Sequence, residues 1–361
     1  ARALARESLH APSSPKFCNV CGVPCSTMMS PLAPRMAPRG AVVMLDKLST
    51  RNVLFDQLEH GVDWAPLTSA LHRAVASANP RLLPGETEWE PPPLPGEPVR
   101  HVHEPRTSWA LRLAYFGPAF RGFAWQQDRP LETVAGRLDH ALTPLLGRRP
   151  TLACAGRTDA GVSALNQLVS FYAWPELTVD DIREAIDGAT PDGSMRLLTA
   201  QRVPRSFHAT FSTRWRRYVY LLPARDLGVT ADDIDRQLAP LVGSPRDYAA
   251  LGRGLPRGKE TTCTLMRASA RAVAVSSESP TEDEAVRVEL VADRFLRRQV
   301  RTLVASAVMA AQEEASGEAT GSEATLSSAP TSLLLRIATS GEQERTAHPA
   351  PARGLVFAGA G

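Results

Sequence analysis

The sequence predicts a mixed α/β fold, because strand-like and helix-like segments follow one another along most of the chain. Apolar residues recur at every second position in 109–115, which predicts a half-buried strand. They recur every three to four positions in 134–145, which predicts a helix that ends before Gly147. Segments 151–155 and 168–173 predict two further strands on either side of a glycine-containing turn.

The rest of the chain continues the same alternation. The predicted elements are a helix over 179–187 capped by Thr178, mainly strand over 195–222, a helix over 230–239, strands over 266–275 and 286–291, a helix over 295–311 and a closing strand over 354–358. Arg294, Arg297, Arg298 and Arg301 are expected on the first two turns of the helix 295–311. The positive end of the helix dipole disfavours cations there, so we expect them to have phosphates or a buried carboxylate as partners.

Composition excludes some classes of protein. The 361 residues are 43% hydrophobic and 22% charged, as in a globular domain. A formal charge of +3 is too small to indicate a polyanionic partner by itself, and no apolar run is long enough to span a membrane. The five cysteines, without a visible secretory signal, predict reduced thiols inside the cell. Cys18, Cys21 and Cys25 lack a fourth ligand at a usual spacing, so no metal site is predicted.

The chain is expected to divide near the proline-rich stretch that ends at residue 106. The predicted parts are an N-terminal extension (1–106) with a helical appendage and a proline-rich linker, the two halves of a catalytic domain (107–222 and 223–361), and a low-complexity insertion (313–331). Residues 1–45 are rich in Ala, Pro, Ser and Arg, with Glu7 as their one acidic residue. A transit peptide to a mitochondrion or plastid and a disordered extension of a cytoplasmic or nuclear protein fit this bias equally.

Residues 153–167 hold the candidate chemistry. Gly156 and Gly161 flank a tight turn that contains Arg157 and Asp159. Glycine adopts backbone angles that a side chain forbids, so such a turn can present a carboxylate and a guanidinium rigidly from a loop. Taken alone, however, the pattern favours an ordinary polar turn.

A basic stretch extends between Gln201 and Leu222, where no acidic residue occurs. In it Arg202, Arg205, Arg214, Arg216 and Arg217 are interleaved with His208, Trp215, Tyr218 and Tyr220. A surface that binds phosphates and stacks on bases needs this combination. A solvated strand face is the alternative explanation.

Several sequence blocks, in the same order, resemble the tRNA pseudouridine synthases of the TruA type. The closest block is 155–164, with the sequence Ala-Gly-Arg-Thr-Asp-Ala-Gly-Val-Ser-Ala, and the others are 122–127, 207–209 with 211–212, 217–220, 295–301 and 354–355. Together they cover roughly residues 110 to 358. Phe116, Ala124, Thr210 and Thr302 depart from the family pattern.

The resemblance implies the pseudouridine synthase fold: a central, mostly antiparallel mixed sheet flanked by helices, in two similar halves with the active-site cleft between them. It implies isomerisation of uridine to pseudouridine in the tRNA anticodon stem-loop, without cofactor or metal, by a homodimer that holds one tRNA across both subunits. Asp159 is then the catalytic carboxylate, which either attacks the ribose C1′ or removes a proton from C2′.

The resemblance also assigns roles to other residues. Arg301 becomes the ion-pair partner of Asp159, with its guanidinium within roughly 4 Å of the carboxylate. Tyr218 would stack on the target base and relay a proton, Leu355 would pack on the other side of the base, and Arg157 would contact the flipped nucleotide. The other predicted RNA contacts are Thr158, Gln126, His208, Arg202, Arg205, Arg214, Arg216, Arg217, Arg253, Arg257 and Lys259.

Two other functions are weighed against this one. A catalytically weak, synthase-like tRNA-binding chaperone is disfavoured because Asp159, Tyr218 and Arg301 are all intact. A carboxylate-dependent hydrolase lacks support because no second acid or metal-ligand set accompanies Asp159 at a recognisable spacing.

Overall fold

The computed structural model describes residues 52–87, 93–96, 106–225, 227–275, 284–317 and 332–361. Residues 46–361 belong to one compact unit. The N-terminal residues 1–45 with Cys18, Cys21 and Cys25, and residues 318–331 of the predicted insertion, lie outside the described residues.

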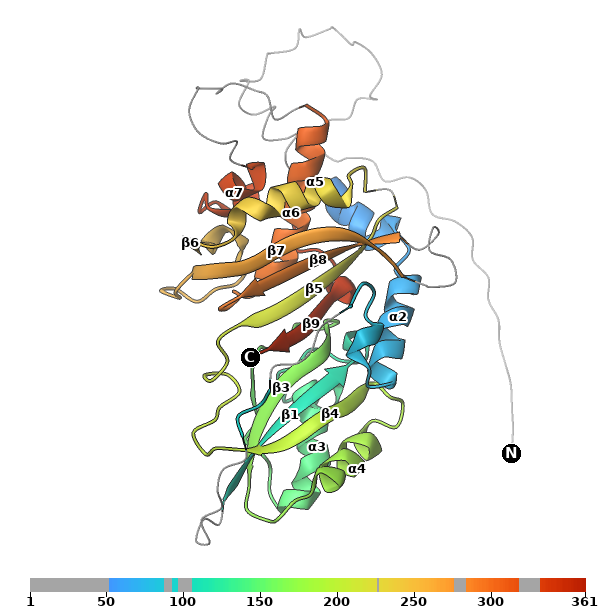
Figure 1. Ribbon diagram of the computed structural model, residues 1–361, viewed down its shortest axis with the longest axis vertical. Coiled ribbons are helices and arrows are strands. Elements are labelled where there is room, and N and C mark those ends of the chain that lie inside the picture. Colours follow the sequence, from blue (N-terminus) through green and yellow to red (C-terminus); the bar gives the residue numbers. More distant parts are fainter. Residues whose placement is uncertain (1–51, 88–92, 97–105, 226, 276–283, 318–331) are drawn as a thin grey trace, which may run out of the picture. The chain divides into compact units, whose positions relative to one another are not determined.

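Strands and helices alternate as the fold class predicts (Figure 1). In chain order they are α2 (Ala65–Ala76), β1 (Thr107–Tyr115), α3 (Val134–Leu146), β2 (Ala153–Cys154), β3 (Ser163–Ala173), α4 (Val179–Ala189), β4 (Met195–Val203), β5 (Arg216–Pro223), α5 (Ala231–Leu238), β6 (Pro245–Asp247), β7 (Thr262–Ala274), β8 (Glu284–Ala292), α6 (Gln299–Ala315), α7 (Leu333–Ala338) and β9 (Leu355–Ala360). Short one-turn segments, among them η1 (Gln57–Gly61) and η9 (Ala352–Gly354), complete the described chain.

The described strands form one large mixed sheet. Its order is β4-β1-β3-β9-β5-β8-β7-β6, and β2 pairs with β3 at the side. The pairing of β3 with β9 is parallel, whereas the other pairings are antiparallel. The expectation of a mostly antiparallel mixed sheet flanked by helices is therefore confirmed. Because β9 lies between β3 and β5, the last strand of the chain joins the N-terminal strands to the C-terminal ones.

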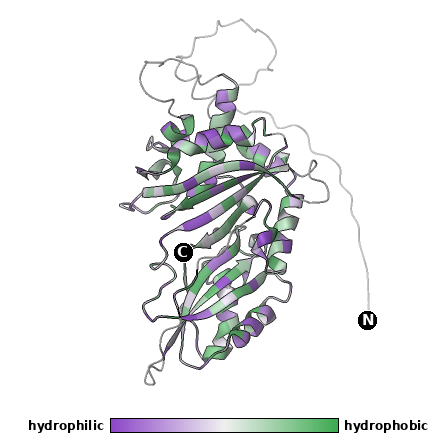
Figure 2. Cartoon of the chain, viewed as in Figure 1, coloured by the Kyte–Doolittle hydropathy of each residue, from purple (hydrophilic) through white to green (hydrophobic). Residues whose placement is uncertain are grey.

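Local signals explain several helix ends. Thr178 accepts a hydrogen bond from Asp181 N, and the Asp181 side chain bonds back to Thr178 N, so the predicted cap is a complete capping box. At the end of α3, Gly147 has a φ of +65°, a conformation that favours glycine and stops the helix. Figure 2 shows hydrophobic residues along the strands and many hydrophilic positions on α4 and α5.

Some predicted boundaries are wrong, and long-range pairing is the reason. The strand expected at 168–173 begins at Ser163, because β3 pairs there with Val356 of β9. The strand expected over 195–222 is two strands, β4 and β5, separated by the loop 204–215. The strand β1 is buried on both faces rather than one, since every residue after Thr107 is buried.

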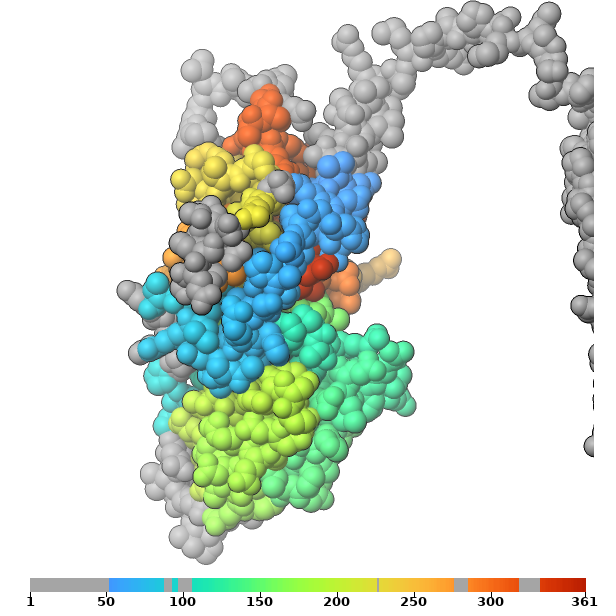
Figure 3. All heavy atoms as spheres, turned by 90° about the vertical axis from the view of Figure 1, so that its right-hand side faces the viewer, coloured from blue at the N-terminus to red at the C-terminus, as the bar shows by residue number. Residues whose placement is uncertain are grey.

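The helical segment before the proline-rich stretch packs into the main core. Leu58, Leu67, Leu71 and Val75 are all at most 2% exposed and belong to the same hydrophobic cluster as the sheet. Trp64 packs edge to face on Tyr220 of β5, with ring centroids 6.4 Å apart. In Figure 3 this segment, in blue, lies against the green and yellow parts of the chain. The segment expected to be an appendage therefore supports the sheet.

Two further features of the described residues concern their helices and their cysteines. None of the helices in these residues combines the length and apolar character needed to cross a bilayer. Among the same residues, Cys154 and Cys263 are free and buried, and no cluster of His, Cys, Asp or Glu suits a metal ion.

Candidate active site

Asp159 lies in the turn between β2 and β3, and the loop after β1 packs against the backbone of this turn. Phe123 N donates a hydrogen bond to Thr158 O at 3.0 Å. Gly122 has a φ of +98°, and a Cβ atom at this position would lie 3.0 Å from Thr158 O and 3.2 Å from the carbonyl carbon of Asp159. Glycine at position 122 therefore lets the two loops come into backbone contact.

A buried hydrogen-bond chain holds the turn from inside. The Tyr115 hydroxyl and Thr158 Oγ1 are 2.9 Å apart, and Gln167 Nε2 donates to the Tyr115 hydroxyl and to Gly156 O at 3.2 and 2.7 Å. Burial raises the pKa of Tyr115 well above its ordinary value, so the phenol stays protonated at neutral pH. Sequence reasoning missed the roles of Tyr115 and Gln167. The alternation along 109–115 placed Tyr115 on an inner face, but its partners come from other strands.

The predicted ion pair is present. Arg301 Nη1 lies 3.6 Å from Asp159 Oδ2, and the two side chains are 16% and 33% exposed. Arg301 Nε also donates to Ala350 O at 2.6 Å, while Ala350 N donates to Arg301 O at 3.1 Å. Burial lowers the pKa of Arg301, but an arginine remains charged at neutral pH. The C-terminal segment before β9 thus fixes a cation beside the Asp159 carboxylate.

The placement of the other arginines near this helix was wrong. Helix α6 begins at Gln299, so Arg294, Arg297 and Arg298 precede it and only Arg301 lies in its first turn. Arg298 has a φ of +62°, a left-handed conformation outside the helical range, so the helix begins only after this residue. Arg294 donates to the carbonyls of Thr262 and Glu260, and the carboxylate that it pairs with, that of Glu260 at 3.8 Å, is exposed rather than buried.

Tyr218 faces the same turn from β5. Its ring packs edge to face on Phe295 and on Phe357, each with a centroid separation of 5.1 Å. The Tyr218 hydroxyl lies 3.4 Å from where a Cβ atom of Gly156 would stand, so the ring lies against the start of the Asp159 turn. Burial raises the pKa of Tyr218 well above its ordinary value, which keeps the hydroxyl protonated.

Several curated proteins that are similar to this chain carry the name tRNA pseudouridine synthase A. This chain is 32% identical over 209 residues to tRNA pseudouridine synthase A of Chlorobium luteolum, and the match covers 54% of this chain and 77% of that protein. It is 30% identical over 212 residues to the protein of the same name from Jannaschia sp., covering 55% and 78%. The chain belongs to the tRNA pseudouridine synthase A family.

Other comparisons add little to this family assignment. With the tRNA pseudouridine synthase A of Methylobacterium radiotolerans the identity is 28% over 265 residues, covering 70% of this chain and 96% of that protein. No family model matches the chain. A solved structure of an unknown protein from Galdieria sulphuraria matches with 11% identity and a TM-score of 0.19, covering 58% of this chain and 94% of that one.

Two predicted RNA contacts of this synthase-family chain are engaged inside the protein. Arg216 donates to the carbonyls of Ala155, Thr213, Asp293 and Thr210. Arg217 is 6% exposed and pairs with Glu86 and Glu289 at 3.0 and 2.8 Å. Arg287 pairs with the same two carboxylates. These contacts favour a structural role for Arg216 and Arg217 over contact with phosphates.

Thr158 and Arg253 also point into the protein. The Thr158 side chain is buried against Tyr115. Arg253 donates to the carbonyls of Ala250 and Gly252 and to Thr346 Oγ1 at 2.5 Å, which ties its loop to the C-terminal segment. The position of an arginine in the sequence does not by itself show whether its side chain bonds within the protein, as that of Arg253 does, or contacts RNA.

The remaining predicted contacts lie at or near the surface. The exposed ones are Arg157, Arg205, Arg214, Arg257 and Lys259. Arg202 lies over the ring of Trp109, 5.5 Å from its centroid, and Gln126 donates to Arg121 O at 3.0 Å. Leu355 is the exception, because it is only 5% exposed as the first residue of β9, opposite Tyr220. His208 stacks on Phe211, which is exposed.

Proposed function

We propose that this chain isomerises uridine to pseudouridine in the anticodon stem-loop of tRNA, with Asp159 as the catalytic carboxylate. The observation that carries the proposal is the Asp159–Arg301 pair, formed by a rigid turn and a helix more than a hundred residues later in the chain. Its setting in a chain of the tRNA pseudouridine synthase A family supports the choice of reaction.

The arrangement suits a reaction in which the uracil leaves the sugar and returns through another atom. The N1–C1′ bond breaks, C5 bonds to C1′, C5 loses its proton and N1 gains one. The Asp159 carboxylate either attacks C1′ or removes the C2′ proton, and the Arg301 cation stabilises the carboxylate that both routes need. Tyr218 stacks on the base and its protonated hydroxyl relays the proton, while Leu355 packs on the opposite face of the base.

RNA binding in this proposal uses the exposed cations. Arg157 contacts the flipped nucleotide, and Arg205, Arg214, Arg257 and Lys259 contact phosphates. The target base must leave its stack to reach Asp159, so the protein opens the stem-loop on binding. We also propose a homodimer that holds one tRNA across both subunits.

Tritium release tests the proposal. tRNA labelled at uridine C5 is incubated with the wild type, with Asp159→Ala and with Asp159→Asn. We expect release with the wild type and none with either variant, together with pseudouridine at anticodon stem-loop positions in mapped product. Equal release from wild type and variants would remove Asp159 from the mechanism. Binding of tRNA without release by the wild type would favour the chaperone alternative.

A further inference from the structure

The loop between β4 and β5, residues 204–215, presents one aromatic ring to solvent. Phe211 is 83% exposed, the highest value for a large hydrophobic side chain among the residues that the structure describes. Single exposed apolar side chains are common on protein surfaces, so the surroundings of Phe211 must indicate whether its ring has a ligand.

The Phe211 ring is held in place from one side. The His208 ring stacks beneath it, with centroids 4.5 Å apart and an angle of 29° between the planes. Thr210 N donates to His208 Nδ1 at 3.3 Å. Ser212 N donates to His208 O, and His208 N donates to Ser212 Oγ, at 2.8 and 3.0 Å. The loop therefore closes on itself and supports the aromatic pair.

The same loop is tied to the strand that leads into the Asp159 turn. Thr210 Oγ1 donates to Cys154 O at 2.7 Å. Arg216 bridges the two segments, since Nη2 donates to Thr210 O at 3.0 Å and Nε donates to Ala155 O at 3.1 Å. Residues 154 and 155 directly precede the Gly-Arg-Thr-Asp turn, so the position of Phe211 is fixed relative to Asp159.

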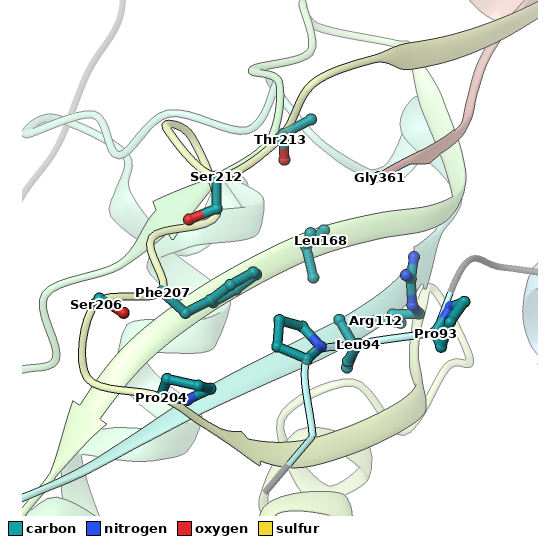
Figure 4. Close-up of a pocket in the computed structure, with 11 residues that line it drawn as sticks. Pro93, Leu94, Arg112, Leu168, Pro204, Ser206, Phe207, Ser212, Thr213 and Gly361 are labelled. Carbon is teal, nitrogen blue, oxygen red and sulfur yellow. The ribbon is translucent and has the colours of Figure 1, made fainter. Parts of the chain in front are cut away.

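The loop has an inner side as well. Ser206, Phe207 and Ser212 line a cavity of about 550 Å³ whose far wall includes Arg112 and Leu168 (Figure 4). Phe207 is 9% exposed and fills part of this space. Phe211 is not among the residues that line it. One phenylalanine of the loop thus anchors it to the sheet, and the other is left for contact with something outside the protein.

The charge around Phe211 identifies the class of ligand. Residues 202–221 contain no acidic residue, and Arg205 and Arg214 on the same loop are exposed. An exposed ring supported from below, flanked by arginines and fixed to a catalytic turn, matches a nucleobase with its phosphates rather than an apolar peptide.

We propose that Phe211, supported by His208, is a stacking platform for an unpaired RNA base next to the uridine that enters the Asp159 site. The inference rests on the proposed function. Stacking on Phe211 would hold the neighbouring nucleotide while the target base leaves its stack, so it contributes to RNA affinity and to the choice of uridine, and not to the chemical step.

The experiment uses the full chain and tRNA anticodon stem-loops that carry 2-aminopurine at one unpaired position each. Stacking quenches this base, so we expect quenching on binding at a position beside the target uridine. Phe211→Ala should abolish that quenching and weaken RNA binding about ten-fold, whereas Phe211→Tyr should stay within about two-fold of the wild type. Phe211→Leu keeps the apolar surface without an aromatic ring and should behave like Phe211→Ala.

Leu82→Ala is the matched control, because Leu82 is a 50% exposed apolar side chain outside the loop, and it should leave binding and quenching unchanged. If Phe211→Ala bound RNA and quenched the 2-aminopurine as the wild type does, the inference would be overturned. The same holds if Phe211→Leu showed wild-type RNA affinity and quenching. Tritium release is measured in parallel. If the wild type releases none, the proposed function fails, while the quenching assay still decides whether Phe211 stacks on RNA.

Discussion

At the scale of single residues, the candidate site depends on groups whose sequence positions are far apart. Asp159 comes from a turn between two strands, Arg301 from the first turn of α6 and Tyr218 from β5. Each is held by uncharged neighbours: the Asp159 turn by the loop at Gly122 and Phe123, the Arg301 guanidinium by Ala350 O, and the Tyr218 ring by Phe295 and Phe357. The electrostatic pair is therefore preorganised before any substrate arrives.

The first prediction concerns the charge beside Asp159. Arg301→Gln removes the cation but keeps a polar side chain of similar length, so we expect kcat to fall about 100-fold with RNA affinity nearly unchanged. Arg301→Lys should retain part of the activity. Single-turnover tritium release at saturating tRNA measures the effect, with Arg336→Gln on the exposed face of α7 as the control. A fall in affinity with an unchanged kcat would show that Arg301 acts on binding alone.

At the scale of elements, the Asp159 turn depends on the loop after β1. Two glycines with positive φ allow a clean comparison. A Cβ atom on Gly122 would press on the backbone of Thr158, Asp159 and Ala160, whereas a Cβ atom on Gly147 at the end of α3 would meet nothing within 4 Å. The first glycine is needed for space and conformation, and the second for conformation alone.

The second prediction follows from this difference. Gly147→Ala should cost about 1 kcal/mol of unfolding free energy and leave turnover intact. Gly122→Ala should cost at least about 2 kcal/mol and lower kcat about 100-fold, because the Asp159 turn must shift. Urea unfolding and tritium release measure the two effects. If both variants lose activity equally, the contact between the loops does not position Asp159.

The third prediction concerns the buried charges that join β5, β8 and the segment before β1. Burial would raise the pKa of Glu289, but Arg217, and with it Arg267 and Arg287, lower it to about 2 from an ordinary value of 4.5. A carboxylate with a lowered folded-state pKa stabilises the protein fully above pH 4.5, and this contribution is lost as pH falls from 4.5 to about 2. The loss amounts to about 3 kcal/mol.

The test compares urea unfolding of the wild type and Glu289→Gln over a series of pH values. The difference in their unfolding free energies should shrink as pH falls through this range, because protonated Glu289 resembles glutamine. Glu132→Gln, which removes an exposed pair with Arg121, should show a difference below about 1 kcal/mol throughout. A wild-type advantage that does not change with pH would mean that Glu289 does not titrate in this window.

At the scale of the whole molecule, β9 fills the middle of the sheet, and the N-terminal segment packs against the chain just before it. The last strand pairs with both β3 and β5, and Gly354 just before it packs against Trp64, where a Cβ atom would come within 2.7 Å of the indole. Tyr220 donates to Pro351 O at 2.6 Å. The N-terminal segment thus supports the strand next to the candidate site.

The fourth prediction tests this support. A chain that starts at residue 106 loses Leu58, Trp64 and Leu71, which are at most 5% exposed, and also loses the Glu86 carboxylate that pairs with two arginines. We expect it to be insoluble or to melt at a much lower temperature than a chain that starts at residue 46. Trp64→Ala in the full chain should cost about 3 kcal/mol. Equal melting temperatures for the two truncated chains would restore the description of 46–106 as an appendage.

The sequence by itself determined the fold class and most helices, because these depend on local periodicity and capping residues. The resemblance to the family, and not the motif alone, then made Asp159 the candidate catalytic group. It also located Arg301, through an ordered set of blocks. Only the tertiary structure decided which arginines face inward, that Thr158 is buried under Tyr115, that β3 starts at Ser163 and that Phe211 is exposed on His208. These features depend on contacts between segments far apart in the chain, and a local pattern carries no information about the partner that a side chain will meet.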